Sequence, residues 1–65
     1  MKFDKDKLLL LMAEQCINPY AFCEKAGITY ATYHKLIKGE SKPKPATIGK
    51  IAKALNVKVQ DLLED

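Results

Sequence analysis

The residues whose types and spacing could do chemistry lie in one short segment, positions 29 to 38. Apolar residues at 33, 36 and 37 predict the buried face of a helix, and the opposite face is polar. That outer face offers hydrogen-bonding groups, amines and one small apolar side chain, from Tyr30, Ala31, His34, Lys35 and Lys38. A helix with such a face can enter the major groove of DNA and contact base edges.

The preceding segment predicts a second short helix that could hold this face in place. Asn18 is a suitable N-cap, Pro19 suits the first helical position, and Gly27 suits a left-handed end. In the next helix, Thr29 is the expected N-cap and Gly39 the expected left-handed end. The inward positions of the first of these helices are Phe22, Cys23 and Ala26. The sequence therefore predicts two short helices joined at one glycine.

Three more helices are expected around this pair. The first follows an N-cap at Asp4 and runs from about 5 to 15, and another begins at Pro45 and ends at Asn56. Its inner stripe is Ile48, Ile51, Ala52 and Leu55. A short fifth helix is expected from the spacing of Val57, Val59, Leu62 and Leu63. No strand pattern competes, so the expected fold is all-α: a compact five-helix bundle forming a single domain over residues 1–65.

Positive charge is concentrated in the middle of the chain. The net charge is only +3, but residues 25–58 carry eight lysines against one acid, Glu40. Such a local excess is typical of proteins that bind polyanions. It overlaps the outward helix face, which strengthens the prediction of DNA binding. The chain has no arginine, so every cationic contact must come from lysine, a flexible point charge.

Other classes of function find little support in the sequence. One histidine, no phosphate-cradling loop and no serine–histidine–acid arrangement argue against an enzyme, and no cofactor or small-molecule ligand is expected. Cys16 and Cys23 fall on inward-facing helical positions and are expected to be small buried residues. A zinc site that joined them to His34 would lack a fourth ligand, so no metal is expected. The absence of a long apolar run or a signal peptide predicts a cytoplasmic protein.

The residues that begin and end these helices resemble those of the Cro/cI-type helix-turn-helix domain of the xenobiotic-response-element family. The matching features are Gly27, Gly39, Pro43 and a last helix that reads IAKALNV, and the resemblance covers nearly all of the chain. It implies a lambda-repressor-like fold and a transcriptional regulator, most simply a Cro-like repressor. Proteins of this kind bind a (pseudo)palindromic operator in double-stranded DNA as homodimers.

The resemblance also implies a role for each outward residue. Thr29, Tyr30, Ala31 and Lys35 match the family's groove-facing positions. Lys35 can donate to guanine, while Ala31 or the Tyr30 ring can meet a thymine methyl group. His34 can approach a base edge or a phosphate. Three lysines flank the groove and are expected to bind phosphates: Lys38, Lys42 and Lys44.

Two positions depart from the family pattern. The family's phosphate-binding glutamine at the start of the second helix is replaced by Pro19, so backbone N–H groups there would have to anchor the phosphate. A buried arginine–glutamate pair of the family falls on Met12 and Ile37, which are expected to touch in the core. Tyr20, beside Pro19, could reach a phosphate or merely cover the proline.

Two questions stay open at the level of sequence. The expected dimer surface is the C-terminal segment with Val57, Val59 and Leu63, and a competing apolar patch is formed by Leu9 and Leu10. The alternative to a repressor is an interaction module, such as an antitoxin, that uses the same domain to bind a partner protein.

Overall fold

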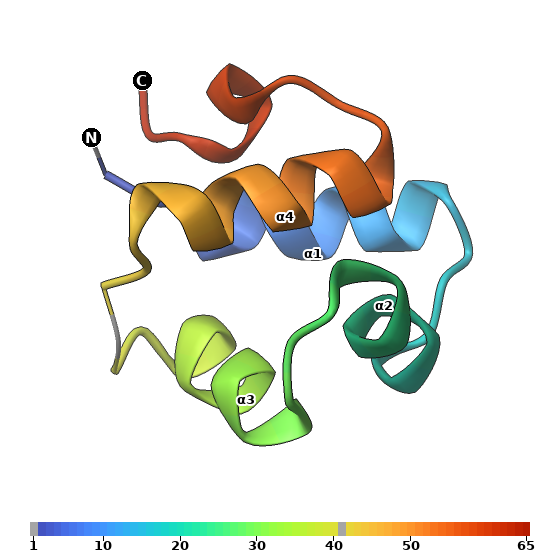
Figure 1. Cartoon of the computed structure of the whole chain (residues 1–65). Coiled ribbons are helices and arrows are strands. Elements are labelled where there is room, and N and C mark those ends of the chain that lie inside the picture. The colour runs from blue at the N-terminus through green and yellow to red at the C-terminus, as the bar shows by residue number, and fades with distance from the viewer. Residues whose placement is uncertain (1, 41) are drawn as a thin grey trace.

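Four α-helices and one short 3₁₀ helix make up the computed structural model, which describes residues 2–40 and 42–65 (Figure 1). Ser41, in the loop expected between the third and fourth helices, and Met1 lie outside the described residues. The all-α prediction is confirmed for the described part of the chain. The elements are α1 (Lys5–Glu14), α2 (Pro19–Ala26), α3 (Tyr30–Lys38), α4 (Pro45–Leu55) and the 3₁₀ helix η1 (Val59–Leu62).

The expected fifth α-helix is wrong. Residues Val59–Leu62 form a single 3₁₀ turn, and Leu63 after it is extended, with φ −103° and ψ 151°. The extended backbone lets Leu63 pair with Phe3 in an isolated antiparallel bridge. Around it the Asp4 N–H donates to the Leu62 carbonyl at 2.8 Å and the Glu64 N–H to the Lys2 carbonyl at 2.8 Å. Tertiary pairing with the other terminus therefore replaces the continued helix that the apolar spacing predicted.

The predicted caps are confirmed. Asn18 Oδ1 accepts a hydrogen bond from the Ala21 N–H at 2.8 Å, so it satisfies one free donor of the first turn of α2. Asp4 and Thr29 cap α1 and α3 in the same way. Gly27 and Gly39 end their helices at φ +71° and +73°, where a side chain would be strained. Asn56 ends α4 in the same left-handed conformation.

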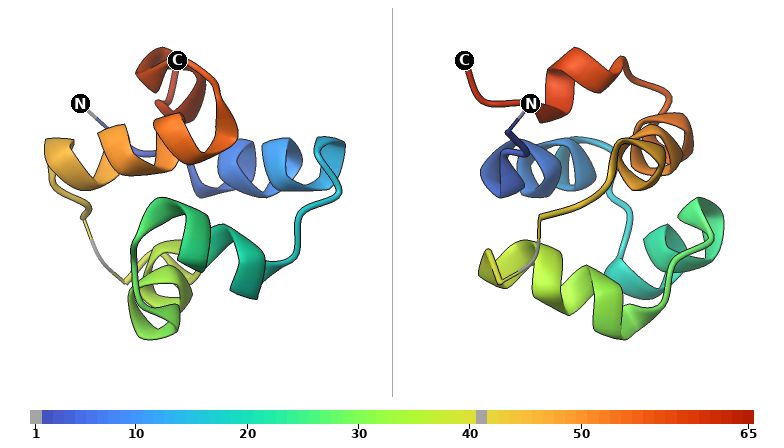
Figure 2. Two further views of the ribbon diagram at one scale, coloured as in Figure 1. Left: turned by 45° about the vertical axis from the view of Figure 1, so that its right-hand side comes forward. Right: turned by 60° about the vertical axis from the view of Figure 1, so that its left-hand side comes forward.

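The helices stack in three tiers. Helices α1 and α4 lie side by side in the middle, α2 and α3 lie on one side of them, and η1 lies on the other (Figures 1 and 2). Contacts of α1 with α3, of α2 with α4, and of η1 with both central helices tie the tiers together. The side chains that fill the space between the tiers are fully buried: Phe22, Leu8, Leu36, Ile48, Ile51, Leu55 and Leu62. Helix α3 is thus held on a firm apolar support.

Three predicted core positions need comment. Met12 is buried, and Ile37 is half-buried against the same apolar cluster, so both belong to one core, and their direct contact stays a prediction. Cys16, expected to face inward, is exposed and has φ 54°. The cause is that α1 ends at Glu14, so helical spacing no longer sets the direction of the Cys16 side chain. The turn is closed instead by the Ile17 N–H, which donates to the Met12 carbonyl at 3.1 Å.

Candidate nucleic-acid interface

Helices α2 and α3 are joined by a tight turn that fixes their relative placement. The Gly27 and Ile28 N–H groups both donate to the Cys23 carbonyl, at 2.9 and 3.1 Å. The Cys23 thiol lies beneath the turn, 3.9 Å from the Thr29 carbonyl oxygen. The turn therefore sets the direction in which α3 begins.

Three aromatic side chains meet on the surface where α2 and α3 begin; we call Tyr20, Tyr30 and His34 the aromatic corner. The rings of Tyr20 and Tyr30 stack with centroids 4.8 Å apart and planes 9° from parallel. The His34 ring meets Tyr30 at 4.7 Å with an edge-on angle of 61°. Tyr33 lies 5.8 Å from Tyr30 and, in the core, 5.8 Å from Phe22. A continuous chain of ring contacts therefore links the buried core to the outer surface.

The aromatic corner gives Tyr20 a contact that the sequence did not predict, and a phosphate contact through its hydroxyl stays a prediction. Tyr20 does not simply cover Pro19, because its ring stacks on Tyr30 of the next helix. The signal in the sequence was a tyrosine in the first turn of both helices, ten positions apart. The sequence spacing of the two tyrosines could not predict this contact. The connection between α2 and α3 decides whether the first turns of the two helices face each other.

The hydroxyl of Thr29 is already engaged within the chain. Its Oγ1 accepts from the Thr32 N–H at 3.1 Å, and its hydroxyl donates to Thr32 Oγ1 at 2.9 Å. A threonine hydroxyl has one donor and two acceptor positions, so a single position remains for DNA. Ala31 beside it is exposed. Thr29 is therefore better suited to supporting α3 than to distinguishing bases.

The first turn of α2 offers less backbone anchoring than the sequence predicted. Pro19 has no N–H, the Ala21 N–H is taken by the Asn18 side chain, and the Phe22 N–H donates to the Asn18 carbonyl at 2.9 Å. The Tyr20 N–H is the remaining amide of this turn that could meet a phosphate. An anchor built on several amides, as in a typical phosphate site at a helix N-terminus, is therefore reduced here to one.

Exposed lysines lie in the last turn of α3 and in the segment that follows it; we call the four lysines among the predicted DNA contacts the lysine set. Within residues 2–40 and 42–65 the one ion pair is between Lys7 and Asp65, at 3.0 Å, and it lies at the termini. The amines of the set are thus free of carboxylate partners among these residues. The members are Lys35, Lys38, Lys42 and Lys44, and all are exposed.

Ionisable groups next to the turn are shifted toward their neutral forms. Removal from water raises the pKa of Tyr30, and the Tyr20 phenol adds to that rise. Burial also raises the pKa of Tyr33 and of the Cys23 thiol. These groups stay uncharged near neutral pH, so the positive field of this surface is set by the lysines.

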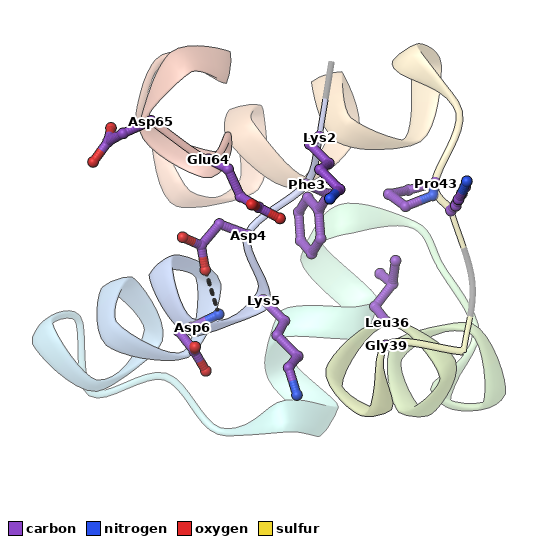
Figure 3. Close-up of a pocket in the computed structure, with 11 residues that line it drawn as sticks. Lys2, Phe3, Asp4, Lys5, Asp6, Leu36, Gly39, Pro43, Glu64 and Asp65 are labelled. Atoms are coloured by element: carbon purple, nitrogen blue, oxygen red, sulfur yellow. Dashed lines mark hydrogen bonds between the residues drawn. The ribbon is translucent and has the colours of Figure 1, made fainter.

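A further depression lies where the two termini meet the loop after α3 (Figure 3). It has a volume of about 650 Å³, and Figure 3 shows the Phe3 ring pointing toward Leu36 within it. Its charged lining mixes both signs: Lys2, Lys5 and Lys42 against Asp4, Asp6, Glu64 and Asp65. In the same described residues no three His, Cys, Asp or Glu side chains lie together in a way that could hold a metal ion.

The residues expected at a dimer interface differ in their surroundings. Val57 and Val59 are half-buried and line a shallow depression along α4 with Ala46 and Gly49. Leu63 is also half-buried, but it pairs with Phe3, and its carbonyl accepts from the Lys7 amine at 2.6 Å. On α1, Leu9 and Leu10 are exposed by 40% and 60%.

The arrangement of α2, the tight turn and an exposed α3 defines a helix-turn-helix DNA-binding domain. A family model for the Cro/C1-type HTH DNA-binding domain matches residues 7–65, and the chain belongs to this family. No curated protein matches the chain. No helix among the described residues is both long enough and apolar enough to cross a membrane.

Two solved structures share the fold. They are titled "Native PhpD with Cadmium Atoms" and "Phpd with cadmium complexed with hydroethylphosphonate (HEP)". Each has a TM-score of 0.83 and 25% sequence identity, and the match covers 100% of this chain and 14% of the other. The chain therefore spans about a seventh of the length of those proteins, and the cadmium and phosphonate named there belong to them.

Proposed function

We propose that this protein is a sequence-specific transcriptional regulator, acting as a Cro-like repressor that inserts α3 into the major groove of its operator. The observation that carries the proposal is the exposed N-terminal half of α3. Tyr30 and Ala31 project from it and Lys35 from the last turn, all above a buried apolar support, and the lysine set has no carboxylate partner among the described residues. A bound domain that covers a promoter would exclude other proteins from it, which is the simplest form of repression.

The proposed contacts fall into two classes. Tyr30, Ala31 and Lys35 contact base edges, because they lie on the exposed part of α3 that would enter the groove. Lys38, Lys42 and Lys44 bind phosphates, which fix the register but carry no sequence information. His34 and Thr29 act mainly within the protein, the first by packing on Tyr30 and the second by capping α3.

The protein is proposed to bind as a homodimer, because a single short helix contacts few base pairs and paired half-sites lie about 10 base pairs apart in this class. The dimer surface we favour contains Val57 and Val59, which line a depression that a second copy could fill; Lys50 and Lys53 also line it. Leu63 contributes less, because it is held in the bridge between the termini.

Selection of bound duplexes from a random pool tests the proposal. A single enriched motif, repeated as a palindrome with half-sites about one helical turn apart, supports a dimeric regulator. An enriched single half-site would retain sequence-specific binding and refute the dimer. Equal affinity for all duplexes at low salt would refute the proposal and leave the interaction module, for which the exposed Leu9 and Leu10 on α1 are the relevant observation.

A further inference from the structure

We propose that Tyr20 is a positioning residue for base recognition: it holds the Tyr30 ring so that Tyr30 contacts a thymine methyl group. The inference rests on the proposed function and adds to it a residue of α2 outside the predicted contacts. It starts from the close parallel stack of the two rings, with centroids 4.8 Å apart. A stacked aromatic pair restrains both partners more strongly than their buried area alone would.

Tyr30 is held on several sides at once. Tyr20 covers it by stacking, the His34 ring meets it edge-on at 4.7 Å, and Tyr33 lies beneath it at 5.8 Å. The Tyr30 side chain still keeps 38% of its surface open, enough to touch a second molecule. A side chain that is restrained but partly open loses little rotational freedom on binding, so its contact favours one geometry.

The other base-contacting candidates lack such restraint. Lys35 is exposed, and a lysine has a flexible four-carbon stem with a strongly hydrated amine. Ala31 carries only a methyl group. Tyr30 is therefore the side chain on this face with a fixed shape, and an apolar ring edge of fixed position matches the thymine methyl group in the major groove.

Tyr20 acts on base choice through Tyr30. It belongs to α2, the helix that crosses the sugar–phosphate backbone in this docking mode, and 70% of its surface is open. Of the rings that contact Tyr30, it alone comes from outside α3. Loss of the Tyr20 ring would leave one side of Tyr30 uncovered and allow the ring to move.

The test uses the full chain and the duplex selected from the random pool, with each thymine replaced in turn by uracil, which lacks only the methyl group. For the wild type we expect one position at which uracil weakens binding by about fourfold, the value of one buried methyl group. Tyr30→Ala should abolish this penalty. Tyr20→Ala should reduce it below about twofold and weaken specific binding about two- to tenfold, while binding to unrelated DNA stays unchanged.

Tyr20→Phe separates positioning from a phosphate contact, because it keeps the ring and removes the hydroxyl. Retention of the uracil penalty and of affinity by Tyr20→Phe supports positioning. If Tyr20→Phe instead binds as weakly as Tyr20→Ala, and equally weakly on all duplexes, Tyr20 is a phosphate ligand and the inference is wrong. Gln60→Ala on η1, which removes an exposed, uncharged side chain outside the proposed DNA and dimer contacts, is the control and should leave both measurements unchanged.

The outcomes distinguish this inference from the proposed function. A wild type that selects a motif but shows no uracil penalty, or one that Tyr20→Ala leaves intact, overturns the role of Tyr20 alone. A wild type that selects no motif overturns both. An NMR spectrum of the free protein gives an independent check, because the inference requires cross-peaks between the ring protons of Tyr20 and Tyr30, and their absence overturns it.

Discussion

The aromatic corner and the lysine set both belong to the candidate interface but are built in opposite ways. Rings of the aromatic corner touch one another and connect through Tyr33 to the buried Phe22. Side chains of the lysine set are exposed and have no carboxylate partner among the described residues. One region is fixed by packing before any ligand arrives, whereas the other is free to adjust to it.

This difference suggests how a chain without arginine can recognise a sequence. Arginine combines charge with a rigid, planar fork, and lysine supplies the charge alone. In this protein the two properties are carried by different residues: charge by the lysines and rigid shape by the tyrosines. We therefore expect changes in the lysine set to alter affinity and its salt dependence, and changes in the corner to alter sequence preference.

The most severe way to break the comparison is to remove the support under the corner. Phe22→Ala deletes a fully buried ring and should lower the free energy of unfolding by about 3–5 kcal/mol, close to the whole stability of a small domain. Urea denaturation followed by circular dichroism measures it. Tyr20→Ala, at the exposed end of the same ring chain, is the matched control and should lose no more than about 1.5 kcal/mol. Equal losses would show that the corner is not supported from the core.

One member of the lysine set, Lys35, tests how sharply affinity and sequence preference are divided between the two regions. Lys35 is the member that we propose to contact a base edge, so Lys35→Ala should relax preference at one base pair by about 1–3 kcal/mol. Binding to single-base variants of the selected duplex measures this value. Lys38→Ala, one turn later on the same helix, should not change the order of preference. A uniform loss on all duplexes for Lys35→Ala would place Lys35 among the phosphate contacts.

The geometry of the turn can be tested through its glycine. Gly27 has φ +71°, so Gly27→Ala should destabilise the protein by about 1–2 kcal/mol and disturb the stacking of Tyr20 on Tyr30. Gly49→Ala is the matched control, because Gly49 lies within α4 and an added methyl group would meet no atom within 4 Å beyond its chain neighbours and the adjacent helix backbone. It should stabilise the protein by about 0.5–1 kcal/mol. Thermal unfolding of both variants gives the comparison, and the same sign for both would contradict it.

A phosphate contact should have a smaller and purely electrostatic effect. Lys42→Ala should reduce the slope of log affinity against log salt by about one unit and weaken specific and non-specific binding alike. Isotherms at several salt concentrations measure the slope. Lys25→Ala in the last turn of α2 is the control, since this lysine is exposed and belongs neither to the lysine set nor to the depression lined by Val57 and Val59. A slope unchanged by Lys42→Ala would remove Lys42 from the interface.

The sequence predicted the helices well because their ends are marked by residues with local effects. The N-caps, the left-handed glycines and the inward stripe of α4 depend on neighbours within one or two turns, and all were confirmed. Predictions from local sequence were wrong where segments distant in the sequence contact each other. The segment after Val59 has helical spacing, yet pairing of Leu63 with Phe3 limits the helix to one turn.

In the candidate site, too, local sequence predicted some features, whereas others depend on contacts between helices. Exposure of Tyr30 and Lys35 followed from helical periodicity, because the buried face of α3 is defined by Tyr33 and Leu36. The stack of Tyr20 on Tyr30 could not be predicted, because it depends on the angle at which α2 and α3 meet. The prediction for Cys16 was wrong because Cys16 itself adopts a left-handed conformation after the end of α1 and no longer follows the helical register.

The two cysteines provide the mildest probe of the turn between α2 and α3. Cys16 is exposed, whereas Cys23 is buried beneath the turn, and burial raises its thiol pKa, so less reactive thiolate is present at a given pH. Alkylation near pH 8 should therefore label Cys16 alone in the folded protein and both thiols in denaturant, as counted by mass spectrometry. Because Cys23 lies against the Thr29 carbonyl, its labelling reports opening of the turn that carries the aromatic corner. Gly27→Ala should accelerate it while the rate at Cys16 stays constant. Rapid labelling of Cys23 in the wild type would mean that the corner is not held rigidly enough to fix Tyr30.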